Sequence, residues 1–108
     1  MLTSSSVQEL VQEELARFKD ATAKRRMLDG LVEPYCQLRP WRYGEPGEEL
    51  PCWIVYDAPR DHVGIAYCEF GFGPRAPWGL LWLEYGGRDM GDDSGWFAHL
   101  EQAVLEML

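Results

Sequence analysis

The sequence predicts an α+β domain in which an N-terminal helix and a C-terminal helix pack on one face of a mainly antiparallel sheet of about four strands. Three patterns predict this class: apolar residues at helical spacing near the start, a second such stripe near the end, and β-branched or aromatic runs between them. Because the chain has 108 residues and 46% of them are hydrophobic, we expect a single domain over residues 1–108 with one hydrophobic core.

The first helix is predicted to begin at Ser6, because the segment from Ser6 to Glu9 has the form of a capping box. Apolar residues then follow at steps of three and four, interleaved with charged ones: Val7, Leu10, Val11, Leu15 and Phe18. This spacing indicates an amphipathic surface helix. Gly30 is a natural residue to follow a helix, so we expect the helix to end between Lys24 and Asp29.

The next segment predicts one short strand followed by an acidic loop. Pro34 and Pro40 remove backbone donors, so a strand here is expected only over Tyr35 to Leu38, at an edge of the sheet. Residues 43–51 combine glycine, proline and glutamate, a composition that favours a loop.

Three further strands are predicted at Trp53 to Tyr56, Val63 to Phe70 and Leu80 to Tyr85. Residues 57–62 contain proline and aspartate in a pattern typical of a turn, so the first two of these strands should form an antiparallel hairpin.

The connection over residues 71–79 is longer than most hairpin loops and carries Phe72, Arg75 and Trp78. Aromatic residues and arginine are enriched at protein interfaces, so this loop is a candidate partner-binding surface. The alternative interpretation is that Phe72 and Trp78 turn inward and close the open end of the core.

A second polar loop, over residues 86–95, contains Asp89, Asp92 and Asp93. Asp93 or Ser94 can cap a final helix that begins near Trp96. Asp92 and Asp93 suit the positive N-terminal end of that helix. The apolar stripe of this helix runs to the last residue printed: Trp96, Phe97, Leu100, Ala103, Val104, Met107 and Leu108.

The net charge of −8 is confined to one part of the sequence. Residues 1–32 carry five basic and five acidic side chains, whereas five basic side chains face thirteen acidic ones from Glu33 onward. An acidic surface repels phosphate backbones, so we expect no nucleic-acid partner, whereas a basic protein partner fits. The alternative is that the acidity serves only solubility.

The sequence contains no pattern that indicates an enzyme, a metal site or a cofactor. Cys36, Cys52 and Cys68 are expected to be buried reduced thiols, because successive cysteines are sixteen residues apart and form no metal-binding motif. The histidines, His62 and His99, lie thirty-seven residues apart. The sequence also shows neither the pattern of a secretory signal nor an apolar run long enough to span a membrane. We therefore expect a cytoplasmic protein without a membrane partner.

Two blocks carry a resemblance to a known class. The stretch GIAYCEFGFGPRAPWGLLWL and the later MGDDSGWFAHLEQAV, within Gly64 to Leu105, resemble small bacterial immunity proteins that accompany polymorphic toxins. The resemblance implies a non-enzymatic antitoxin that binds a cognate toxin and blocks its active site. Such toxins are often nucleases with basic clefts, which agrees with the acidic charge.

From these observations we predict a partner-binding surface that combines loop residues with an acidic rim. Its residues are Glu69, Phe72, Arg75 and Trp78, with Asp89, Asp92 and Asp93 as the rim. Two other functions stay open: a small-molecule-binding module whose five tryptophans line a pocket, and an accessory subunit of a larger assembly with an exposed apolar patch. The sequence does not fix the oligomeric state.

Overall fold

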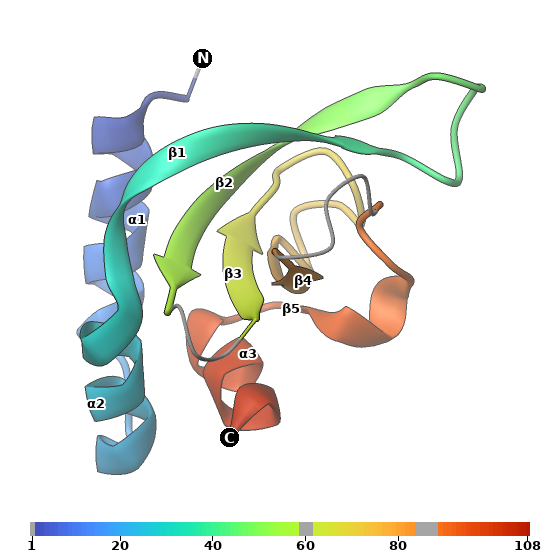
Figure 1. Cartoon of the computed structure of the whole chain (residues 1–108). Helices are drawn as coiled ribbons and strands as arrows, with labels where there is room; N and C mark the ends of the chain where they lie inside the picture. The colour runs from blue at the N-terminus through green and yellow to red at the C-terminus, as the bar shows by residue number, and fades with distance from the viewer. Residues whose placement is uncertain (1, 59–61, 84–88) are drawn as a thin grey trace.

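The computed structural model describes residues 2–58, 62–83 and 89–108, and it confirms the α+β class. The described residues form an antiparallel sheet in the order β1-β2-β3-β4-β5, with three α-helices beside it (Figure 1). The sheet has one strand more than the four expected. The elements are α1 (Ser4–Leu15), α2 (Ala21–Gly30), β1 (Leu31–Pro40), β2 (Glu49–Asp57), β3 (Val63–Tyr67), β4 (Trp78–Trp82), the short 3-10 helix η1 (Asp93–Gly95), β5 (Trp96–Phe97) and α3 (Leu100–Met107). Within the described ranges, the helices are too short or too polar to cross a lipid bilayer.

The N-terminal helix predicted as one element is two helices. Thr3, not Ser6, caps α1: the Thr3 hydroxyl accepts from the Ser6 amide at 3.1 Å, and the Ser6 hydroxyl accepts from the Thr3 amide at 2.7 Å. Asp20 then caps α2, because its carboxylate accepts from the Ala23 amide at 2.8 Å. The chain therefore leaves the first helix after Leu15 and starts a second, which includes Gly30 and so ends one residue beyond the predicted range of Lys24 to Asp29.

Two carboxylates tie the three helices together. A Glu14 oxygen on α1 accepts from the amide of Leu100, the first residue of α3, at 2.8 Å. In return, a Glu101 oxygen on α3 accepts from the amides of Lys19 and Asp20, at 2.8 and 2.7 Å, just before α2. Backbone N–H groups at the start of a helix lack partners inside the helix, so each carboxylate satisfies donors that another helix leaves open.

Replacing Glu101 with alanine should lower the free energy of unfolding by about 1–2 kcal/mol, because two backbone donors lose a charged acceptor. Glu106→Ala is the matched control, since Glu106 is an exposed glutamate on the same helix. Urea unfolding followed by circular dichroism measures both variants. Equal unfolding midpoints for the two variants would contradict the capping role of Glu101.

The strands are longer at the start of the sheet than predicted and shorter at its end. β1 pairs with β2 from Leu31↔Tyr56 to Pro40↔Glu49, well beyond the segment Tyr35 to Leu38. β1 tolerates its two prolines because it is an edge strand, where a missing donor costs no ladder bond on the open side. β3 ends at Tyr67 instead of Phe70, and the predicted end of the next strand, at residues 84 and 85, lies outside the described residues.

The last two elements correct the prediction that a helix starts near Trp96. Trp96 and Phe97 form β5, opposite Gly79 and Trp78 of β4, and α3 begins only at Leu100. η1 precedes β5, and its cap is Asp92, not the Asp93 or Ser94 predicted to cap the final helix: an Asp92 oxygen accepts from the Ser94 amide at 3.0 Å.

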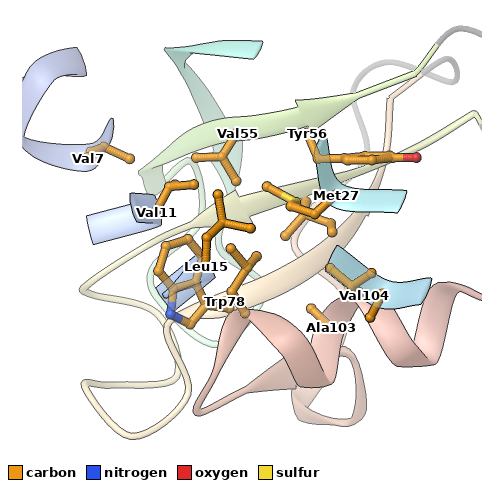
Figure 2. Packing of buried hydrophobic residues seen from close by; sticks show 12 residues of the cluster. Val7, Val11, Leu15, Met27, Val55, Tyr56, Trp78, Ala103 and Val104 are labelled. Atoms are coloured by element: carbon orange, nitrogen blue, oxygen red, sulfur yellow. The ribbon is translucent and has the colours of Figure 1, made fainter. Parts of the chain in front are cut away.

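Buried side chains cover both faces of the sheet and form two cores, whereas a single core was expected. All three α-helices lie against one face, as predicted, and form the helix-side core (Figure 2). Its buried residues are Val7, Val11, Leu15, Ala23, Met27, Val55, Tyr56, Ile65, Trp78, Leu100, Ala103 and Val104. The other face carries the loop-side core, made of Cys52, Ile54, Ala66, Cys68, Leu81, Met90 and Trp96. Neighbouring strand residues point to opposite faces, which explains why Ile65 and Ala66 belong to different cores.

Candidate functional site

The candidate site is a surface built by three connections that cover the loop-side core. We call it the loop surface and define it as residues 41–48, 68–77 and 89–95. In Figure 1 these segments lie on the side of the sheet away from α1. Trp41, Leu50 and Phe72 pack against the loop-side core, so the surface rests on a filled interior.

Three aromatic rings from two of these segments, Trp41, Tyr43 and Phe72, meet on the loop surface. The ring centroids of Trp41 and Tyr43 are 5.2 Å apart, those of Trp41 and Phe72 are 5.0 Å apart, and those of Tyr43 and Phe72 are 5.9 Å apart, all edge to face. Phe72 also lies 5.8 Å from the buried Trp96, whose indole N–H donates to the Met90 carbonyl at 2.8 Å. Edge-to-face pairs add stabilisation beyond burial, so the three rings hold one another in place.

The top of this aromatic cluster faces solvent. Tyr43 is 56% exposed, and it borders a shallow hollow of about 270 Å³ together with Trp41, Phe72 and Asp93. A neighbouring hollow of about 450 Å³ is lined by Trp41, Arg42, Asp89 and the acidic segment 45–49. The cluster thus offers exposed aromatic area beside carboxylates.

An ion pair links two of the three segments. Arg42 Nε lies 3.0 Å from Asp89 Oδ2, and the Gly91 amide donates to the other carboxylate oxygen at 2.8 Å. The hydrogen bond from Arg42, followed by that from Gly91, holds the pKa of Asp89 below its usual value of 3.8. A depressed carboxyl pKa means that the pair contributes stability above the ordinary pKa and loses it as the pH falls through the lower, folded-state value. Asp89 therefore fastens the surface, and its charge is matched by Arg42.

Among the described residues, Asp93 and the glutamates of the first loop have no ion-pair partner. Asp93 is exposed at the rim of the smaller hollow. Glu45, Glu48 and Glu49 are also exposed, and a Glu48 oxygen accepts from the Glu45 amide at 3.1 Å. Asp92 is exposed as well, and hydrogen bonds from the Ser94 side chain and then its backbone lower the pKa of Asp92.

Four of the predicted site residues lie on the loop surface near the aromatic cluster: Phe72, Asp89, Asp92 and Asp93. Glu69 and Arg75 are exposed on the same β3–β4 connection, and no described contact joins either to the aromatic rings. Trp78 contradicts the prediction that it belongs to the partner-binding surface. It is only 3% exposed, lies in the helix-side core and packs edge to face on Tyr67 with ring centroids 4.8 Å apart. Trp78 belongs to β4, where it pairs with Tyr67 of β3 and Phe97 of β5, and it is not available as a surface anchor.

Trp41 and Tyr43, the two rings contributed by the first loop, were not predicted as site residues. The run Trp41-Arg42-Tyr43 has the same combination of aromatic residues and arginine as residues 71–79. This combination is the feature of the sequence that could have identified the first loop as part of the site. The contact itself is tertiary, because Tyr43 and Phe72 are far apart in the sequence.

The tryptophans do not line one common pocket. Trp78 and Trp96 are both buried, but they lie in the cores on opposite faces of the sheet. Trp41 and Trp82 reach different surface hollows, and Trp82 is 56% exposed. This arrangement gives no support to a small-molecule pocket lined by the five tryptophans.

The three cysteines differ in their surroundings. Cys52 and Cys68 are buried free thiols, as predicted, whereas Cys36 is exposed on the edge strand β1, contrary to the prediction. Within the described part of the chain, no three His, Cys, Asp or Glu side chains lie close enough together to hold a metal ion.

Comparison of the sequence with protein-family models gives no match, and neither curated proteins nor solved structures match the chain.

Proposed function

We propose that this protein is a cytoplasmic immunity protein that neutralises a bacterial toxin by stoichiometric binding, and that the loop surface is its contact surface. The observation that carries the proposal is the solvent-facing aromatic cluster of Trp41, Tyr43 and Phe72, flanked by unmatched carboxylates. The protein acts in this proposal without catalysis and without a cofactor.

The geometry of the cluster suits a binding anchor. Tyr43 exposes more than half of its surface while its ring is braced by Trp41 and Phe72. A ring already fixed in one position loses little conformational entropy on binding, so more of the burial free energy contributes to affinity. Tyrosine and tryptophan are the residues most often found at the energetic centre of interfaces.

The charge favours a basic partner. The excess of eight negative charges lies wholly beyond residue 32, and it includes Asp93 and the glutamates beside the cluster. Carboxylates around an apolar centre accelerate encounter with a positively charged surface and repel acidic competitors. A nuclease toxin fits, because its substrate cleft is basic and covering that cleft would block substrate access.

Tyr43→Ala should weaken toxin binding by about tenfold or more, because it removes the most exposed ring of the cluster. The experiment identifies the protein that co-purifies from the native host, produces it recombinantly in inactive form, and measures affinity by calorimetry. Leu28→Ala is the control, since it truncates a half-exposed apolar side chain on α2, outside the loop surface. Affinities of the two variants within threefold of each other would reject the loop surface as the contact.

A further inference from the structure

Cys52 and Cys68 face each other across two neighbouring strands. β2 and β3 pair antiparallel with Trp53 opposite Tyr67 and Ile54 opposite Ala66. The next position in this register places Cys52 opposite Cys68, which directly follows β3. Both side chains are fully buried in the loop-side core.

The backbone geometry of this pair suits a disulfide. The amide of Cys68 donates to the Pro77 carbonyl at 2.9 Å, so it points away from β2 and toward β4. Cys52 and Cys68 therefore occupy a non-hydrogen-bonded position of the β2–β3 ladder, where opposing Cα atoms are about 4.5 Å apart. Disulfides span Cα separations of about 4.4–6.8 Å, so the bond can form without moving the strands.

The surroundings of the pair favour one thiolate and one thiol. Hydrogen bonding to the Cys52 thiol and to the backbone amides of Gly71 and Phe70 outweighs the effect of burial and lowers the pKa of Cys68. The same sulfur–sulfur hydrogen bond, together with burial, raises the pKa of Cys52. Arg39 adds a positive charge near the pair: it is 3% exposed, and its guanidinium donates to the Trp82 carbonyl at 3.0 Å.

We propose that Cys52 and Cys68 form a redox-active dithiol that hydrogen peroxide converts into an intramolecular disulfide. The Cys68 thiolate attacks one peroxide oxygen, the O–O bond breaks, and Cys68 becomes a sulfenic acid while hydroxide leaves and takes up a proton. The Cys52 sulfur then attacks the Cys68 sulfur, the S–O bond breaks, and a second water leaves. The two thiols lose two electrons in total, and one peroxide becomes two waters.

The disulfide would act on the base of the loop surface. Cys68 begins the connection that carries Phe72, and Cys52 lies two residues after Leu50; both Phe72 and Leu50 pack on the loop-side core. Oxidation would therefore tie β2 to this connection and restrain the aromatic cluster from below. The chemistry of the dithiol does not depend on the proposed toxin partner, so the two proposals stand or fall separately.

The test uses the full chain carrying Cys36→Ser, which removes the exposed thiol. The protein is treated with hydrogen peroxide, denatured, alkylated with iodoacetamide and weighed intact. We expect a mass loss of about 2 Da and no alkylation, together with a midpoint of thermal unfolding raised by roughly 10 °C and restored by dithiothreitol.

A second variant, Cys36→Ser with Cys52→Ser, provides the comparison. It lacks the resolving thiol, so Cys68 should gain one oxygen and react with dimedone in place of losing mass. The proposal is overturned if the Cys36→Ser protein keeps two alkylatable thiols under conditions that oxidise Cys36 in the wild type. Accumulation of oxygen adducts on Cys68 while Cys52 is present, or disulfide-linked dimers, would overturn it as well.

Discussion

Replacing Trp78 with alanine should lower the free energy of unfolding by about 3–5 kcal/mol, the largest effect expected of any single change considered. Trp78 is nearly fully buried among the residues of the helix-side core (Figure 2). Its ring also packs edge to face on Tyr67. Alanine would leave a cavity that the surrounding side chains fill only in part. Domains of this size have about 5–15 kcal/mol in total, so the variant would retain little reserve.

Trp82→Ala is the matched control, because Trp82 lies on the same strand with more than half of its surface exposed. We expect it to change the free energy of unfolding by no more than about 0.5 kcal/mol. Urea unfolding followed by far-ultraviolet circular dichroism gives both values. Similar losses in the two variants would show that Trp78 is not a core residue, and would restore it as a candidate surface anchor.

Gly79→Ala should be the second most damaging change, at about 3 kcal/mol, because the space beside Gly79 is already filled. A Cβ atom built on Gly79 would lie 2.2 Å from Cδ2 of Trp96, much closer than atoms tolerate. Trp96 cannot move aside freely, since its indole is hydrogen-bonded to the Met90 carbonyl and its backbone pairs with Gly79. The added methyl group therefore pushes β5 and the ring that supports Phe72.

Gly95→Ala provides the comparison, because the nearest atom to a Cβ at Gly95 is the Leu80 carbonyl oxygen at 4.0 Å. This substitution should leave the unfolding midpoint within about 0.5 kcal/mol of the wild type. Urea titration measures stability, and near-ultraviolet circular dichroism reports the packing of the tryptophans. If Gly79→Ala kept both the midpoint and the near-ultraviolet spectrum, the described position of Trp96 would be wrong.

The sequence was sufficient for the fold class and for most strands, because local composition decides where β-branched and aromatic runs pair. It was insufficient at the first helix, where apolar spacing continues past Leu15 even though Asp20 starts a new helix. It was also insufficient at Trp96 and Phe97, whose positions suit a helical stripe as well as a strand. Pairing with β4 decided between the two, and that partner lies outside the local segment.

Part of the candidate site could also be predicted from the sequence, and part of it could not. The polar loop residues Asp89, Asp92 and Asp93 could be found from composition, because aspartate between glycines indicates an exposed loop. The burial of Trp78 could not, because the surrounding glycines and prolines concealed a strand. Trp41 and Tyr43 reach Phe72 only after β1, β2 and β3 have paired, so their joint surface is a property of the fold.

The reciprocal carboxylate caps of Glu14 and Glu101 bear on how the protein is made in the cell. Each cap closes a loop of more than eighty residues, between Glu14 and Leu100 and between Lys19 and Glu101. During translation α1 and α2 leave the ribosome long before α3 exists, so the caps cannot form on the nascent chain until residues 100 and 101 emerge. Contacts of such long range slow folding, so the helix layer is completed late, after synthesis has passed residue 101.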